Sequence, residues 1–200
     1  MKKFVYLISP NVIGKDFFKS LEKVLSYGNV EFFQLRVKKI KSENLLKIAK
    51  RIRRITEKHE VKFIINDNYN IALKVKADGC HIGQHDGSII EAKKKLKKKI
   101  LGVTCHGSIS LAKKAVKKKA DYLAFGSFFK SKLKPNAKKA NLRIIKLIKK
   151  KINRPIVVIG GINNFNYKRL MKLGANYIAI SSFIWDNPTL KPEKAIKKFK

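Results

Sequence analysis

The feature that most constrains the fold of this chain is a regular alternation of short apolar segments with longer amphipathic segments. The two kinds recur with a period of about 25 residues along the whole sequence. The apolar segments read as β-strands at residues 4–9, 32–37, 62–66, 79–82, 100–104, 122–125, 155–159 and 177–181. The amphipathic segments read as helices at residues 16–26, 42–59, 70–76, 88–98, 108–118, 141–151, 166–173 and 191–198.

Strands that alternate with helices predict a parallel β-sheet. Eight such units predict a closed (β/α)₈ or TIM barrel, and we expect residues 1–200 to form it as a single domain. The alternative is a doubly wound open sheet, which usually carries a glycine-rich fingerprint after its first strand. The stretch "YLISPNVIGKD" has no such fingerprint, so the barrel is favoured.

The net charge is extreme, at +35 from 48 Lys and Arg against 13 Asp and Glu. The excess is mostly lysine within helical segments such as "EAKKKLKKKI", where it alternates with apolar positions and is typical of a solvated outer face. Nucleic-acid binding is the alternative, but aromatic residues are not interleaved with the lysines as a stacking surface would require. We therefore expect no nucleic-acid partner.

The remaining composition indicates a cytoplasmic protein. No apolar run is long enough to span a bilayer, so no membrane partner is expected. The start "MKKFVYLISPN" reads as a first strand rather than a signal peptide. Two cysteines, Cys80 and Cys105, do not form a disulfide framework and favour a reducing compartment. The sequence leaves a homo-oligomer open.

The segment "EFFQLRVKKI" alternates between two faces. Its polar set is Gln34, Arg36 and Lys38, and its apolar set is Phe33, Leu35 and Val37. In a barrel the outward face packs against helices and must be apolar, so the polar set is expected to point inward, towards the C-terminal mouth. Two inward cations without partners would be costly, which predicts a bound anion or a neutralising carboxylate.

Two carboxylates are expected at the same mouth. Asp67 follows the third strand in "FIINDN", beside Asn66, and Asp86 follows the fourth in "DGCHIGQHD". Two oxygen ligands together with substrate phosphates are a usual way to hold Mg²⁺. The alternative is that each aspartate caps the helix after it. Asp78 precedes its strand and is expected to be structural.

The last strands predict a second anion site. Gly160 and Gly161 end the seventh strand, and Ser181 and Ser182 end the eighth. Loops after these strands often bind phosphate in this architecture, and glycine lets backbone N–H groups approach an oxyanion. The polar stretch "AFGSFFKSKLKPNAKKA" after the sixth strand is a candidate lid with Ser131 and Lys134 as phosphate contacts; a mobile basic loop is the alternative.

The histidines and cysteines do not favour zinc. His81 and His85 have irregular spacing relative to Cys80, Cys105 and His106, and alternation puts Cys80 and His81 on opposite faces of a strand. The two thiols are expected to be packed in the core.

Seven motifs occur in an order that resembles thiamine-phosphate synthases, over nearly the whole chain. They are "QLRVK", "IND", "HIGQHD", "GVTCH", "FGSFFKSKLK", "VIGGI" and "IAISS". The resemblance implies a Mg²⁺-dependent transferase of thiamine biosynthesis with a TIM-barrel fold. Its partners would be two small molecules, 4-amino-2-methyl-5-(diphosphooxymethyl)pyrimidine and 4-methyl-5-(2-phosphooxyethyl)thiazole, which it would condense to thiamine phosphate and diphosphate by dissociative substitution.

The resemblance also implies roles for individual residues. The catalytic cations would be Arg36, Lys38 and Lys134. The pyrimidine diphosphate would be bound by Gln34, Arg36, Lys38, Asn66, Thr104 and Lys134. The thiazole phosphate would be bound by Ser131, Gly161, Ser181 and Ser182. The ligands of Mg²⁺ would be Asp67 and Asp86.

Four positions depart from the family pattern. Thr104 stands where the family usually has Ser, and Val37 stands where it usually has Glu. In the lid, Ser131 and Leu133 occupy two positions that usually carry Thr hydroxyls. The alternatives are a thiazole tautomerase of the same fold, with His106 as proton shuttle, a basic nucleic-acid-binding protein, and a synthase-like chain inactivated through Leu133.

The lid departure gives a first prediction. Leu133→Thr is expected to lower the KM for the thiazole phosphate, because it restores a hydroxyl donor to the lid. Steady-state kinetics at saturating pyrimidine diphosphate measure it. Leu133→Val is the matched control, since it has nearly the shape of Thr without the hydroxyl. A KM for Leu133→Thr that is unchanged or raised would show that this hydroxyl is irrelevant.

Overall fold

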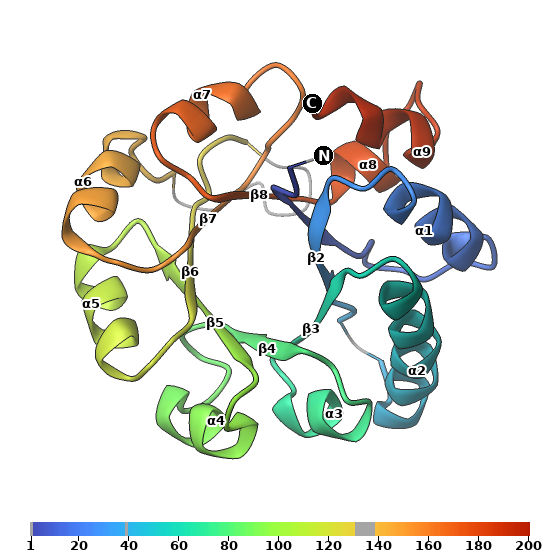
Figure 1. The fold of residues 1–200 in the computed structure, drawn as a ribbon, viewed down its shortest axis with the longest axis horizontal. Coiled ribbons are helices and arrows are strands. Elements are labelled where there is room, and N and C mark those ends of the chain that lie inside the picture. The colour runs from blue at the N-terminus through green and yellow to red at the C-terminus, as the bar shows by residue number, and fades with distance from the viewer. Residues whose placement is uncertain (1, 39, 131–138) are drawn as a thin grey trace.

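Eight parallel strands close into a barrel in sequential order (Figure 1). The structure, a computed structural model, describes residues 2–38, 40–130 and 139–200. The strands are β1 Val5–Ile8, β2 Val30–Leu35, β3 Lys62–Asn66, β4 Gly79–Ile82, β5 Ile100–His106, β6 Tyr122–Phe125, β7 Ile156–Ile159 and β8 Tyr177–Ile180. The first and last strands pair with each other, with Val5 opposite Ile178, so the sheet has no free edge. The predicted TIM barrel is confirmed.

Helices surround the barrel as an outer ring (Figure 1). They are α1 Phe17–Leu25, α2 Ser42–Lys58, α3 Tyr69–Lys74, α4 Ile89–Leu96, α5 Ile109–Lys117, α6 Arg143–Lys151, α7 Tyr167–Lys172, α8 Ser182–Trp185 and α9 Pro192–Ala195, with a 3₁₀ turn at Ile196–Lys198. The sequence missed α8 and read α9 and the 3₁₀ turn as one helix. Most other ends agree to within two residues.

Strand β2 begins and ends two residues earlier than predicted. Its ladder with β1 ends at Gln34, and the backbone N–H of Arg36 instead donates to the Ser9 hydroxyl at 2.9 Å. A side chain thus replaces the next rung of the sheet. Arg36 and Lys38 therefore follow the strand in the loop at the mouth, and Lys38 is exposed rather than inside the barrel.

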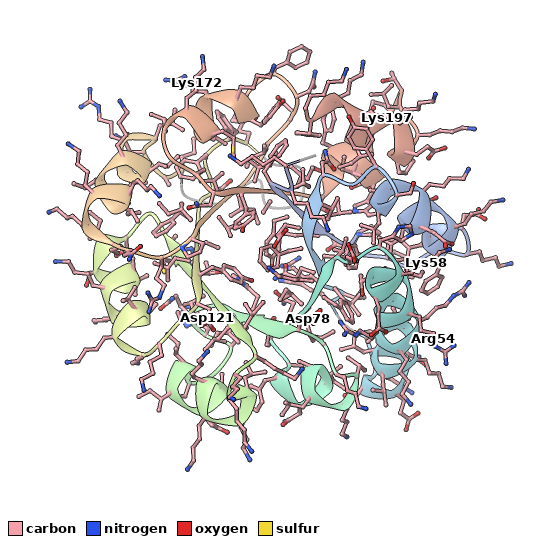
Figure 2. All side chains as sticks on the ribbon, in the orientation of Figure 1. Arg54, Lys58, Asp78, Asp121, Lys172 and Lys197 are labelled. Carbon is pink, nitrogen blue, oxygen red and sulfur yellow. The ribbon has the colours of Figure 1, made fainter. Side chains whose placement is uncertain are left out.

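Two apolar layers hold the fold together. Phe33 and Leu35 belong to the layer between strands and helices, whereas Phe32 belongs to a smaller cluster inside the barrel. Gln34 is in phase with Phe32 and is 3% exposed, so β2 has the orientation that its alternation predicts. The charged side chains of Arg54, Lys58, Lys172 and Lys197 point outward from the helical ring (Figure 2).

Side-chain oxygens complete the sheet at its amino-terminal end. Asp78 precedes β4 and accepts hydrogen bonds from the backbone N–H of Phe63, at 2.7 Å, and from Arg53, at 2.6 Å. Asp121 precedes β6 and accepts from the N–H of Leu101 at 2.7 Å. The prediction that Asp78 is structural is confirmed.

None of the helices in the described part of the chain is both long enough and apolar enough to cross a lipid bilayer.

The inner cluster depends on one glycine. Gly102 on β5 faces the ring of Tyr122 on the neighbouring strand β6, and a Cβ at Gly102 would overlap that ring. Glycine at this position therefore makes room for a buried tyrosine inside the barrel.

We expect Gly102→Ala to lower the free energy of unfolding by about 2 kcal/mol, because the aromatic ring has to shift in a packed interior. Urea denaturation measures it. Gly14→Ala is the matched control, since a Cβ there meets no atom within 4 Å. Equal effects of the two substitutions would contradict the overlap.

Candidate active site

The carboxyl ends of several strands bring the expected site residues to one mouth of the barrel. Gln34 lies on β2, Asn66 ends β3, and Thr104 lies on β5. Their neighbours along each strand belong to the outer apolar layer, so these three side chains face inward. Parallel strands end at the same rim, where barrels of this type hold their active sites.

Asp67 and Asp86 are not helix caps. The N-cap of α3 is Asn68, which accepts from the N–H of Ile71 at 2.9 Å, and the N-cap of α4 is Ser88. The carboxylate of Asp86 instead accepts from the N–H of Gly83 at 3.0 Å. The capping alternative is therefore wrong for both aspartates, and their carboxyl groups are left for another role.

The two carboxyl groups lie beside each other. Burial and the neighbouring carboxyl of Asp86 together raise the pKa of Asp67 to about 6, against the opposing effect of Arg36 and Lys38. Asp67 also has a left-handed backbone, with φ of 62°, and accepts from the Asn66 amide at 2.5 Å. Two carboxylates at close range repel each other unless a proton or a cation lies near them.

The donor set at this rim suits Mg²⁺. Two aspartates supply hard oxygen ligands and leave positions for water and for phosphate oxygens. Within the described residues there is no group of three or more His, Cys, Asp or Glu side chains that could hold a metal. A set of two aspartates suits a cation that keeps several water ligands, rather than one held in a complete protein cage.

The motif "HIGQHD" fixes Thr104 from two sides. His81 is buried; its Nε2 lies 2.8 Å from the Thr104 hydroxyl and its Nδ1 lies 3.0 Å from the Tyr122 hydroxyl. The side-chain amide of Gln84 donates to the Thr104 carbonyl. Both imidazole nitrogens are therefore engaged by hydroxyl groups, which disfavours His81 as a zinc ligand.

The cysteines are packed as expected. Cys80 and Cys105 are free and buried in the outer apolar layer. Burial raises the pKa of each thiol to about 12, so neither is a thiolate near neutral pH.

The glycines after β7 lie against the start of the loop after β6. Gly160 and Gly161 have φ values of 105° and 60°, and the N–H of Phe129 donates to the Gly160 carbonyl at 3.0 Å. The amide of Asn166 donates to the Gly161 carbonyl at 3.0 Å. A Cβ at Gly161 would overlap the backbone at Phe129 and Lys130, so only glycine fits this turn.

Ser9 connects the two sides of the mouth. Its carbonyl accepts from the Ser181 hydroxyl at 3.1 Å, and its own hydroxyl contacts the backbone of Arg36. Trp185 on α8 donates to the Ile8 carbonyl at 2.7 Å and fastens this helix to the end of β1. The expected phosphate residues Ser181 and Ser182 are thereby held near the loop that carries Arg36.

Ser131, Leu133 and Lys134 lie outside the described residues. On either side of these positions, the N–H of Ala140 donates to the Ser127 carbonyl at 2.8 Å.

Comparison with known proteins identifies the family. A sequence profile described as thiamine monophosphate synthase matches residues 5–184. The chain belongs to the thiamine monophosphate synthase family. A thiamine-phosphate synthase of Pelagibacter ubique (strain HTCC1062) is 54% identical over 200 residues, covering 100% of this chain and 97% of the relative. A thiamine-phosphate synthase of Erythrobacter litoralis (strain HTCC2594) is 39% identical, covering 90% and 87%.

Solved structures agree with this assignment. A thiamine phosphate pyrophosphorylase from Pyrococcus furiosus superposes with a TM-score of 0.88 at 30% identity, covering 98% of this chain and 92% of that one. A 3-hexulose-6-phosphate synthase superposes with a TM-score of 0.72 at 17% identity, over 97% of each chain, and shares the fold.

Several residues at the mouth of this thiamine monophosphate synthase family member were not predicted from the sequence. Ser9, Gln84, Tyr122 and Trp185 position the mouth without having been assigned a role. Gln84 stands inside a motif already singled out, and strand alternation puts Tyr122 in phase with the interior. The partner that each residue contacts depends on the register between strands, and this register cannot be read from a single sequence.

The stability of this family member is expected to depend on pH through His81. Burial lowers the pKa of His81 from 6.5 to about 4; Asp86 opposes this and Arg36 adds to it. Between these two values the unfolded chain binds a proton that the folded chain does not. The contribution of His81 to the free energy of unfolding should therefore fall by about 3 kcal/mol as the pH is lowered from about 7 to 4, whereas the raised pKa of Asp67 acts in the opposite direction.

Urea denaturation at a series of pH values tests this for the unaltered protein, for His81→Gln and for the exposed control His85→Gln. The pH-dependent contribution of His81 to the free energy of unfolding should vanish in His81→Gln and persist in His85→Gln. Parallel pH curves for all three proteins would contradict a buried neutral His81.

Proposed function

We propose that this chain joins 4-amino-2-methyl-5-(diphosphooxymethyl)pyrimidine to 4-methyl-5-(2-phosphooxyethyl)thiazole and releases diphosphate, acting as a thiamine-phosphate synthase. The observation that carries the proposal is the pairing of Asp67 and Asp86, neither of which caps a helix, beside Arg36 and Lys38. This grouping of two acids with two cations suits a diphosphate and its metal ion. Membership of the synthase family supports the same activity.

The diphosphate of the pyrimidine substrate would bind among these groups. Asp67 and Asp86 would hold Mg²⁺, which supplies positive charge to the diphosphate oxygens. Arg36 offers a planar fork of donors and Lys38 a mobile point charge, and both already act on the Asp67 carboxyl. Gln34 and Asn66 face the same interior and would contact the pyrimidine.

The reaction that this site favours is a dissociative substitution. The bond between the substituent carbon and the diphosphate oxygen breaks, and its electron pair leaves with the diphosphate. The aminopyrimidine stabilises the resulting cation, and the thiazole nitrogen then forms the new carbon–nitrogen bond. Arg36, Lys38 and Lys134 would stabilise the charge on the leaving group, which is electrostatic catalysis combined with positioning.

The thiazole phosphate would bind on the neighbouring side of the mouth. Gly161 exposes backbone in a turn that only glycine fits, and Ser181 and Ser182 lie where β8 passes into α8. The Ser181 hydroxyl donates to the Ser9 carbonyl in this structure. Ser181 would therefore contact the phosphate either after its side chain rotates or through its backbone N–H. Ser131 would join this group from the lid.

The tautomerase and nucleic-acid-binding alternatives are not favoured. The relatives reported above carry the synthase name, and the acid pair with its adjacent cations has no role in a simple isomerisation. His106, the candidate proton shuttle of a tautomerase, ends β5.

We expect the purified protein to form thiamine phosphate from the two phosphorylated precursors only when Mg²⁺ is present. Asp67→Asn should reduce turnover by about a hundredfold or more, because it removes a charged metal ligand. A coupled assay for thiamine phosphate with and without EDTA measures both effects.

Glu57→Gln is the matched control, because Glu57 is exposed on α2 and pairs with Arg53 at 3.6 Å. This variant should keep the turnover of the unaltered protein. Full activity in EDTA would remove the metal assignment, and normal turnover of Asp67→Asn would remove the role of that residue.

A further inference from the structure

A chain of polar groups runs through the apolar interior of the barrel and ends at the mouth. The hydroxyls of Tyr6 and Tyr122 lie 2.7 Å apart, and the Tyr122 hydroxyl lies 3.0 Å from His81 Nδ1. His81 Nε2 lies 2.8 Å from the Thr104 hydroxyl. Tyr6, Tyr122 and His81 are 2%, 2% and 8% exposed, whereas Thr104 is only half-buried.

The number of protons shared by these four side chains limits which of them can donate each hydrogen bond. His81 is buried and both of its ring nitrogens face neutral hydroxyl groups, which favours a neutral ring that carries one N–H. Each tyrosine contributes one O–H, since burial raises both of their pKa values. A buried donor without an acceptor is costly, and the proton arrangement that leaves none is favoured.

The tautomer with the proton on Nδ1 would leave one tyrosine O–H group without a hydrogen-bond acceptor. His81 would then donate to the Tyr122 oxygen, and Tyr122 could donate only to Tyr6. Among the residues that the structure describes, Tyr122 is the one hydrogen-bond partner of the Tyr6 hydroxyl, so the Tyr6 proton would have no acceptor.

The tautomer with the proton on Nε2 satisfies every buried donor. Tyr6 donates to Tyr122, Tyr122 donates to Nδ1 of His81, and Nε2–H donates to the Thr104 oxygen. The hydroxyl proton of Thr104 is then not used inside the barrel. It is available at the mouth, beyond the interior cluster, for an acceptor outside the protein.

We propose that Tyr122 fixes His81 in its Nε2–H tautomer, so that Thr104 donates its hydroxyl proton to a phosphate oxygen bound at the mouth. His81 and Tyr122 are then positioning residues that act through Thr104. Gln84 assists, because its amide holds the Thr104 carbonyl and limits movement of that part of β5. The inference rests on the proposed function for the identity of the anion, a diphosphate, but the tautomer itself does not.

The tautomer can be measured without any ligand. Two-dimensional ¹⁵N–¹H NMR of the histidine rings in the unaltered protein distinguishes a protonated Nε2 from a protonated Nδ1. The His81 signals are assigned by their loss in His81→Gln or, if that variant does not fold, by substituting His59, His85 and His106 in turn. We expect protonated Nε2; a protonated Nδ1 would overturn the proposal.

The role of Thr104 is tested with inorganic diphosphate and Mg²⁺ as the probe. Isothermal titration should show that Thr104→Val weakens binding about tenfold, as expected for one lost hydrogen bond to a charged group. Tyr122→Phe removes the hydroxyl that donates to Nδ1, so the Nε2–H tautomer loses the bond that favours it. Thr104 can then donate to His81 in part of the molecules, which should weaken binding about threefold. Tyr6→Phe is the matched control, because the Tyr122 hydroxyl still donates a hydrogen bond to Nδ1. This variant should keep both the Nε2–H tautomer and the diphosphate affinity.

The double variant decides whether Tyr122 acts through Thr104. In the Thr104→Val background, Tyr122→Phe should cause no further loss of diphosphate affinity. Independent, multiplying losses, or no loss from Tyr122→Phe alone, would overturn the proposal.

The precursor-coupling assay separates this result from the proposed function. A protein that binds diphosphate with the expected variant pattern but forms no thiamine phosphate would refute the proposed function and leave the inference standing. A protein that forms thiamine phosphate but has the Nδ1–H tautomer would support the proposed function and refute the inference. Failure to bind diphosphate at all would overturn the donor role of Thr104.

Discussion

Closure of the barrel is the constraint on which the rest of this structure depends. Eight parallel strands that pair in a ring divide their side chains between a narrow interior and an outer layer under the helices. The outer layer has to be apolar, so polar residues on the strands can only face the interior. There they meet near the rim, which explains why Gln34, Asn66 and Thr104 come together although they are far apart in the sequence.

The scarce acids are divided between the two ends of the barrel, with different tasks. At the amino-terminal end, Asp78 and Asp121 accept backbone N–H groups of neighbouring strands and pair with Arg53 and Lys93. At the opposite end, Asp67 and Asp86 face each other and remain without a structural task of that kind. The lysine excess lies mainly outside both groups, on the exposed sides of the helices (Figure 2).

Periodicity predicted the architecture and much of the site, because both follow from which face of a strand is polar. It could not predict α8, since "SFIW" is too short to show a helical period. It misplaced the end of β2, because the alternation continues through Val37 although Ser9 replaces the sheet partner at Arg36. It also missed the contact between His81 and Tyr122, which depends on the register of β4, β5 and β6. Ser131, Leu133 and Lys134 stay predictions, as they lie outside the described residues.

The position of Ser9 has a consequence for how the protein is made. This residue follows the first strand, yet its carbonyl is held by Ser181, which follows the last one, and its hydroxyl is held by Arg36. The seam where the ring closes is thus also the border between the two proposed substrate sites. A growing polypeptide on the ribosome cannot assemble that border until β8 has been synthesised and has paired with β1.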